Sequence, residues 1–382
     1  KHKTCARGKP LRVMAKLKEE FSFIRGNYLV LVLSWIFMDF AGEIPGTYYS
    51  LYILALGGTP FTIGLIGFAS SIALASVQFP GGYLADRYGR RWLVSTMTFG
   101  VAISYIFYAI APSWHLILFG AVISNLCLIY QPALLAMIAD SLPSERRGMG
   151  YSIINLIASV ATTPGPVVAG ILYAGFGLVG GMRISYVIVT AFFLIAAALR
   201  SRLKETVMEP KRFESQEFLS SYPAALKESV KVWGVVPRTV LYLFLANTLG
   251  MFAFAMVSPY IVVYAVRVLG ISELQWSLLL TFLFIAMIIF ALPAGKFIDK
   301  VGRKIPLLTS FLIMAFAVLL FVYGDFLMLL AALPLFGLSQ ILSMSAFGSL
   351  QADLVPAEQR GKVIGFTNFF NYVVSSIGVL AG

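Results

Sequence analysis

Two acidic side chains inside an apolar stretch are the residues of this sequence best suited to handle a proton or a cation. Asp39 and Glu43 stand four residues apart in WIFMDFAGEIPG, so in a helix they share one face. Asp39 lies about 18 Å along a helix from Asn27, where the apolar stretch begins. In a membrane, burial disfavours the ionised form of a carboxyl, and a second carboxyl nearby disfavours it further. The pair is therefore a candidate proton or cation site. Alternatively, Asp39 is a structural residue satisfied by a neighbouring Tyr or Asn, and Glu43 lies at the outer mouth.

The apolar stretch around this pair is one of many. Hydrophobic residues make up 59% of the 382 residues, charged residues make up 12%, and the mean hydropathy is +0.87. Apolar stretches of about 18 residues or more recur along the whole chain, each long enough to cross a bilayer core of about 30 Å as a helix. The alternation of a membrane β-barrel is not seen. The sequence predicts an all-α membrane protein.

The net charge of +12 is distributed unevenly between the predicted loops. With the N-terminus in the cytoplasm, all but two of the 29 Lys and Arg residues fall in cytoplasmic segments, and the exceptions are Arg183 and Arg267. This asymmetry follows the positive-inside rule. The charge therefore sets the topology in a cell membrane, and it gives no reason to expect a nucleic-acid partner.

A charged cluster occurs twice in the chain, as GGYLADRYGRR at 81–91 and as AGKFIDKVGRK at 294–304. The matched pairs are Asp86 with Asp299, Gly89 with Gly302 and Arg90 with Arg303, each 213 residues apart. The same offset places ADSLPSERRG on ADLVPAEQRG. One register across separated loops predicts two homologous halves of six helices each.

The repeat and the charge pattern divide the chain into four segments. A cytoplasmic N-terminal segment covers 1–26, a six-helix bundle covers 27–199, a cytoplasmic linker with an amphipathic helix covers 200–237, and a second bundle covers 238–382. Because residue 382 falls inside an apolar run, we expect about eleven helices here, with the twelfth missing from this chain.

The first charged cluster resembles the loop signature G-x-x-x-D-R-x-G-R-[RK] of the major facilitator superfamily, between helices two and three. The weaker copy resembles its expected counterpart between helices eight and nine. The resemblance implies a transporter that works by alternating access. It also implies a conformational latch that closes the outward-facing state, formed by Gly82, Asp86, Gly89, Arg90, Asp299, Gly302 and Arg303. The alternative is that these residues only anchor the loops.

Amide side chains also occur inside the apolar stretches, where polar groups usually face the bundle interior. In the family that the chain resembles, helices one, four, seven and ten line the cavity. Together with the carboxyl pair, the candidate proton-binding and substrate-binding residues are Asn125, Gln131, Asn155, Asn247, Gln340, Asn368 and Asn371.

The segment TTPGPVVAG carries the candidate helix bend, with Gly165, Pro166 and Gly170. It resembles the G-P-x-x-x-G kernel of the family's antiporter signature. Proline removes a backbone hydrogen bond and glycine permits close packing, although both are common in membrane helices. The arginine that many proton-coupled members carry early in helix four is absent, which moves the predicted coupling site to helix one.

The leading hypothesis is a secondary transporter, with proton-coupled efflux favoured. The alternatives are a nutrient importer or uniporter of the same fold and, from another class, a transport-dead membrane receptor. No nucleophile with an adjacent base is visible, and the two histidines have no metal-ligand partner, so no enzyme activity, metal or cofactor is expected. With no arginine recognised well inside a span, a neutral or cationic substrate is favoured, and a monomer is expected.

Overall fold

The computed structural model describes residues 23–143, 147–207, 223, 238–354 and 360–382, and the regular structure within them is helical. The first half contains α2 (Gly26–Gly46), α3 (Tyr49–Ala55), α4 (Pro60–Tyr88), α5 (Arg90–Ala109), α6 (Trp114–Cys127), the 3-10 helix η1 (Leu128–Tyr130), α7 (Gln131–Ser141), α8 (Arg147–Thr162) and α9 (Gly165–Arg200). The second half contains α11 (Arg238–Val257), the 3-10 helix η4 (Ser258–Tyr260), α12 (Ile261–Arg267), α13 (Glu273–Val301), α14 (Lys304–Tyr323), α15 (Phe326–Leu354) and α16 (Arg360–Ala381). The amphipathic helix predicted in 200–237 falls largely outside the described residues.

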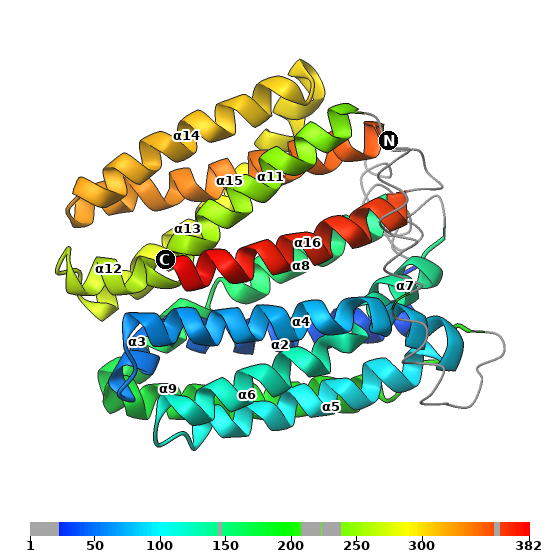
Figure 1. Cartoon of the computed structure of the whole chain (residues 1–382), viewed down its shortest axis with the longest axis horizontal. Helices are drawn as coiled ribbons and strands as arrows, with labels where there is room; N and C mark the ends of the chain where they lie inside the picture. Colours follow the sequence, from blue (N-terminus) through cyan, green and yellow to red (C-terminus); the bar gives the residue numbers. More distant parts are fainter. Residues whose placement is uncertain (1–22, 144–146, 208–222, 224–237, 355–359) are drawn as a thin grey trace, which may run out of the picture.

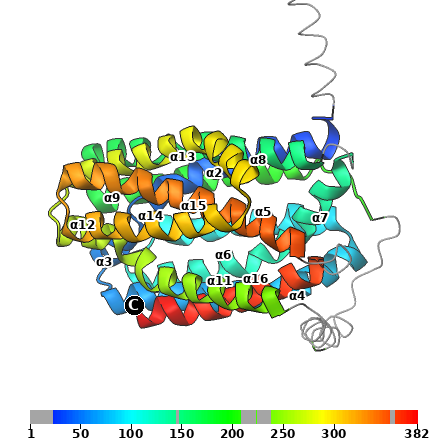
Figure 2. The ribbon, with the colours of Figure 1, turned by 90° about the horizontal axis from the view of Figure 1, so that it is seen from above.

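The two halves lie beside each other, with the first half below and the second half above in Figure 1. The long helices run along a common direction when the molecule is seen from above (Figure 2). Helices α4 and α16 are in contact along the boundary between the halves, and α9 contacts α13 there as well. The fold is therefore all-α and built from two helical bundles, as predicted.

The helices repeat at the spacing that the sequence predicts. Both ends of α13 lie 213 residues after the ends of α4, and each helix has 29 residues. Each begins with a capping box, in which Thr59 Oγ1 accepts from the backbone N–H of Thr62 at 3.3 Å and Ser272 Oγ accepts from that of Gln275 at 3.2 Å. The internal repeat is confirmed down to the hydrogen bonds that start these helices.

The turns at both ends of α4 and α13 repeat in the same way. Gly57 and Gly270 precede the helices with φ of 82° and 69°, and Gly89 and Gly302 follow them with φ of 99° and 83°. Residues with a Cβ rarely adopt these positive φ values, so glycine is strongly favoured at these positions. The glycines of the two charged clusters therefore end helices α4 and α13 at equivalent points.

Nine helical segments within the described residues are long and apolar enough to cross a membrane. One of them, Met149–Arg200, has 52 residues, which as a straight helix would extend about 78 Å. It reverses direction at Gly177, where φ is 67° and ψ is 179°, so it supplies two crossings rather than one. Large apolar side chains cover the outer surface, such as Leu292 at 78% and Leu312 at 74% exposed. The chain is a multi-pass membrane protein.

Candidate functional site

The carboxyl pair of α2 lies against the start of α9. Asp39 and Glu43 are both partly buried and lie one helical turn apart on α2. Gly165, the first residue of α9, approaches Glu43 so closely that a Cβ at this glycine would lie 2.7 Å from the Glu43 Cβ. Only a glycine fits at that contact, so Gly165 sets the distance between α9 and the carboxyl pair.

In the segment of the predicted helix bend, the helical structure is interrupted just before Gly165. Helix α8 ends at Thr162 and α9 begins at Gly165, with Pro164 at the N-cap. Pro166 therefore occupies the first turn of α9, where a missing N–H costs nothing because no carbonyl precedes it in the helix. Two residues outside the helices, Thr163 and Pro164, make the break.

Gly170 reaches the other half of the molecule. A Cβ at this position would lie 2.5 Å from Ser277 Oγ on α13. The glycines of the predicted bend therefore have two separate packing roles: Gly165 admits α2 of its own half, and Gly170 admits α13 of the second half. Helix α9 links the carboxyl pair to the contact between the halves.

A buried arginine is the last residue of α9, at the end of a span rather than well inside it, and its side chain turns inward. Arg200 is 0% exposed, and its Nε donates to Ser34 Oγ at 3.0 Å. Its Nη1 donates to Thr98 Oγ1 at 3.0 Å. The sequence places this residue at the edge of the basic linker, where it resembles an ordinary topology anchor, and only the structure shows that its side chain turns inward.

The predicted amide residues do not form one cluster of mutual hydrogen bonds. Gln78 Nε2 donates to Gln131 Oε1 at 2.8 Å, joining α4 to α7, and Asn371 Oδ1 accepts from Thr248 Oγ1 at 2.9 Å, joining α16 to α11. Asn125 Nδ2 donates at 2.9 Å to a carbonyl of its own helix. Asn247 is partly buried, whereas Asn155, Gln340 and Asn368 are exposed.

The first charged cluster is fastened to its own half. Arg90 pairs with Asp140 at the end of α7, and its Nη1 also donates to Thr206 Oγ1 at 3.3 Å. Gly82 is a helical residue of α4 with only ordinary contact at the Cβ position, 3.8 Å from Pro132 Cβ, so no close approach requires glycine there. The side chains of Asp86 and Asp299 lie outside the described residues. Arg303 directly precedes α14, as Arg90 begins α5.

Glu205, which the sequence analysis did not select, holds the start of α5. Its carboxylate accepts from the backbone N–H groups of Arg90 and Arg91, both at 3.0 Å, and from those of Thr206 and Val207 at 2.9 and 3.1 Å. Partial burial acts to raise the pKa of Glu205, but these N–H groups outweigh it, so the pKa lies below its ordinary value. The carboxylate also faces the positive end of the helix dipole of α5.

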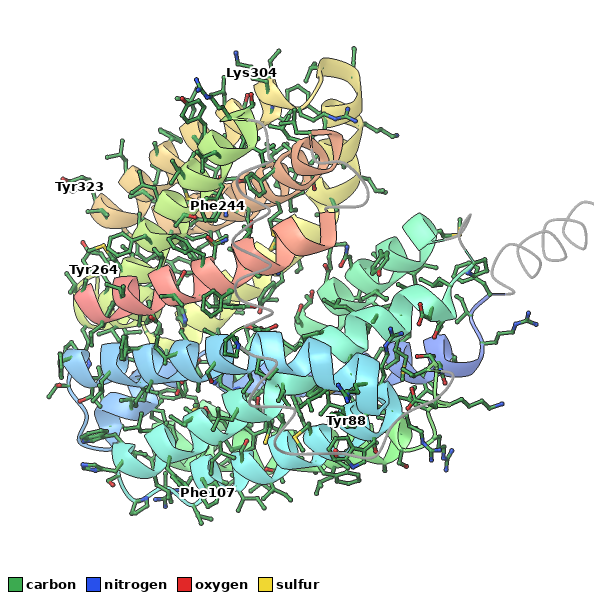
Figure 3. The ribbon with its side chains drawn as sticks, turned by 45° about the vertical axis from the view of Figure 1, so that its right-hand side comes forward. Tyr88, Phe107, Phe244, Tyr264, Lys304 and Tyr323 are labelled. Carbon is green, nitrogen blue, oxygen red and sulfur yellow. The ribbon has the colours of Figure 1, made fainter. Side chains whose placement is uncertain are left out.

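Hydrogen bonds join the two halves at the end of the molecule opposite the charged clusters, here called the joined end. Tyr48 Oη donates to the carbonyl of Glu273, the first residue of α13, at 2.6 Å. Tyr260 Oη donates to the carbonyl of Pro60, the first residue of α4, at 3.3 Å. Trp276 Nε1 and Ser50 Oγ add bonds to carbonyls of the opposite half, at 3.2 and 2.5 Å. The ribbons of the halves diverge from here toward the end that carries Tyr88 (Figure 3).

Two homologous helical bundles, joined at one end and with a carboxyl pair inside a span of the first, have the architecture of a membrane transporter. The profile of the Major Facilitator Superfamily matches residues 31–380, and the chain belongs to this family. It is 25% identical over 326 residues to the uncharacterized MFS-type transporter MJ1560 of Methanocaldococcus jannaschii, covering 84% of this chain and 81% of that protein.

Two further proteins show the range of relatives. The chain is 25% identical over 330 residues to the multi-drug resistance efflux pump PmrA of Streptococcus pneumoniae, covering 84% of this chain and 78% of the pump. A solved D-xylose-proton symporter has the same fold, with a TM-score of 0.69 at 15% identity over 92% of this chain and 88% of the symporter. The similar proteins therefore include an efflux pump, by sequence, and a symporter, by fold alone.

Proposed function

We propose that the protein is a proton-coupled exporter of a small neutral or cationic molecule, working by alternating access. The observation that carries the proposal is the carboxyl pair of α2, with Asp39 within the span and Glu43 packed against Gly165. An ionised carboxylate at the centre of a membrane costs about 2.5–3.5 kcal/mol on the insertion scale, so such a residue is usually functional. Asp39 is assigned the coupling proton, and Glu43 tunes Asp39 or contacts a cationic substrate.

The similarity to a multidrug efflux pump supports export over import. We place the protein in the cell membrane as a monomer, with the N-terminus and the charged clusters on the cytoplasmic side, because the Lys and Arg residues gather in those segments. This placement implies that the joined end faces outward, as expected for an inward-facing arrangement. The amides on α4 and α7 and those on α11 and α16 belong to the two halves that alternate around the substrate.

We also propose that Asp86 and its cluster latch the outward-facing state, together with the equivalent residues of the second half. The fastening of Arg90 to Asp140 and of Glu205 to the start of α5 supports this role, because it makes the loop after α4 move with the first half as one body. Replacement Asp86→Asn is expected to shift the protein toward the inward-facing state and to slow turnover. Accessibility labelling at the joined end tests this role. If Asp86→Asn leaves the labelling unchanged, Asp86 is not part of a latch.

The alternative function is uptake of a nutrient, and the shared fold with a D-xylose-proton symporter favours it. The direction in which protons and substrate move relative to each other distinguishes export from uptake. The full chain is reconstituted in liposomes with the charged clusters facing the bath, and the membrane potential is held at zero with valinomycin and equal K⁺. A panel of labelled compounds includes ethidium as an organic cation, together with sugars and organic acids.

Proton antiport predicts accumulation in a lumen more acidic than the bath, and symport predicts accumulation in a more alkaline lumen. Asp39→Asn is expected to abolish accumulation and to keep part of the exchange between equilibrated sides, because the amide copies the neutral acid but releases no proton. Asp325→Asn is the matched control, since Asp325 is an exposed carboxyl that caps α15 and Asn caps helices equally well. Full accumulation by Asp39→Asn would remove Asp39 from the mechanism, and no transport of any compound would favour a receptor.

A further inference from the structure

Arg200 has a hydrogen-bonding group that the surrounding residues leave unused. The side chain is completely buried, Ser34 and Thr98 accept from two of its nitrogens, and its guanidinium carbon lies 5.3 Å from the centre of the Tyr130 ring. The third nitrogen, Nη2, is buried and has no hydrogen-bond partner among the described residues. A buried guanidinium cannot shed its proton, so an unpaired one is costly, and the site favours an anionic partner.

Asp39 is the carboxyl placed to fill this gap. Arg200 Nε is bonded to Ser34, which lies on α2 five residues before Asp39, or about 7.5 Å along the helix axis. Side chains of a helix tilt toward its N-terminus. Asp39 therefore leans toward the level of Ser34 but lies about 140° around α2 from it, so the pairing requires its side chain to swing toward Arg200, which leans back into the span from the last turn of α9. Arg200 is thus bonded directly to the helix that carries Asp39.

The other charged and titratable groups around Arg200 are accounted for. Glu43 lies one turn beyond Asp39 on α2, farther from Ser34, and packs against Gly165. Asp140 on α7 pairs with Arg90. Tyr130 presents its ring face to the guanidinium rather than its hydroxyl, and Tyr105 of α5 lies near Tyr130. Asp39 is the carboxyl that remains for Arg200 within this part of the described structure.

We propose that Arg200 is a positioning residue for Asp39, and that its Nη2 binds the carboxylate when Asp39 has lost its proton. The inference rests on the proposed role of Asp39 as the proton site. With Asp39 protonated, Ser34 and Thr98 hold the guanidinium, as in this structure. When the proton passes to the water on the accessible side, the new carboxylate pairs with Arg200 and draws α2 and the end of α9 together. Loss of the proton thereby changes the packing of two helices of the first half.

A double-mutant cycle tests the pairing in the full chain. Ethidium exchange between equilibrated sides of liposomes is compared for the wild type, Arg200→Gln, Asp39→Asn and the double variant. The melting temperature of each purified protein is read as well, since it needs no substrate. We expect Arg200→Gln to slow exchange about tenfold when Asp39 is present and less than about twofold when Asn replaces it, a coupling of at least about 1 kcal/mol. Arg200→Lys, which keeps the charge, is expected to retain most of the exchange.

The outcomes separate this inference from the proposed function. If Arg200→Gln slows exchange equally with Asp39 and with Asn at position 39, Arg200 has only a packing role, and the proposed pairing is wrong. If Arg200→Gln does not fold, recovery of folded protein in the double variant supports the pairing, and failure in both backgrounds overturns it. Ser34→Ala removes a hydrogen bond but no charge, so its effect should not depend on the residue at position 39. Normal gradient-driven accumulation by Asp39→Asn would refute the proton site instead, whatever the cycle shows.

Discussion

The two halves of the molecule use one backbone design for different chemistry. Gly165 starts α9 and packs against α2 at Glu43, and Gly378, 213 residues later, packs against α11, where a Cβ would lie 2.7 Å from the carbonyl oxygen of Phe252. Phe252 is the residue equivalent to Asp39, and Met256 is equivalent to Glu43. The close approach of the two helices is therefore a property of the fold, whereas the carboxyl pair belongs to the first half alone. The repeat builds the frame, and only one copy carries the charges.

This difference predicts that the same substitution has different consequences in the two halves. Gly165→Ala pushes on Glu43 and Gly378→Ala pushes on the backbone of Phe252, and each is expected to destabilise the protein by about 1–3 kcal/mol through overpacking. Because only Gly165 touches the carboxyl pair, its replacement should also lower proton-driven accumulation more than exchange. Melting temperatures and the two transport assays measure this. Equal loss of proton-driven accumulation in both variants would show that coupling does not depend on the carboxyl pair.

A second prediction concerns Glu205, the residue through which the first half holds its charged cluster in place. Glu205→Gln is expected to lower the melting temperature at pH 7, because the amide is a weaker acceptor for the four backbone N–H groups. Since the folded-state pKa of Glu205 lies below its ordinary value of 4.5, the carboxylate stabilises the fold above that value, and the stabilisation is lost as the pH falls through the lowered pKa. The difference in melting temperature between the wild type and Glu205→Gln should therefore become smaller below about pH 4. Lys204→Gln, a change in the adjacent exposed side chain, is the control, and a difference that grows in acid would contradict the assignment.

The joined end supplies a third comparison, because Tyr48 and Tyr260 make equivalent bonds in opposite directions. Tyr48→Phe is expected to favour opening of this end by about 0.5–1.5 kcal/mol. Tyr260→Phe should do less, since its bond to Pro60 is longer, 3.3 against 2.6 Å, and exposed. Labelling of Ser277→Cys, a buried position between the halves, reads the opening when Cys5→Ser and Cys127→Ser remove the native thiols. Faster labelling in Tyr260→Phe than in Tyr48→Phe would reverse the ranking.

The sequence was sufficient for features that depend on local spacing. Hydropathy predicts the spans, and the 213-residue offset predicts the equivalent ends of α4 and α13, because caps and left-handed glycines are encoded within a few residues of the turn. The i, i+4 pair of Asp39 and Glu43 also follows from helix geometry alone. Their packing against Gly165 does not, because it joins residues more than a hundred positions apart.

The features that the sequence could not predict depend on where a helix end turns relative to distant neighbours. Arg200 stands between an apolar span and a basic linker, so its local sequence favours the membrane surface. Its burial results from Ser34 and Thr98, which lie 166 and 102 residues away and offer hydroxyl acceptors at the right level. The role of Glu205 could not be predicted for the same reason. Its carboxylate binds the N–H groups at the start of α5, more than a hundred residues earlier in the chain. The interruption at Thr163 and Pro164 could not be placed from the sequence because the segment offers two prolines.

The smallest predicted effect tests whether the two halves are energetically as well as geometrically equivalent. Thr59→Ala and Ser272→Ala each remove the side chain that starts a 29-residue helix, and each should cost about 1 kcal/mol. The two costs should agree within about 0.5 kcal/mol, and the double variant should show their sum, because the sites are separate and share no partner. Melting temperature in detergent gives all three values. Both caps stand at the joined end, beside the carbonyls of Pro60 and Glu273 that the crossing tyrosines bind. A double variant that loses clearly more than the sum would therefore mean that the two helix starts support each other across the boundary, so that the joined end, rather than each half, is the unit that unfolds.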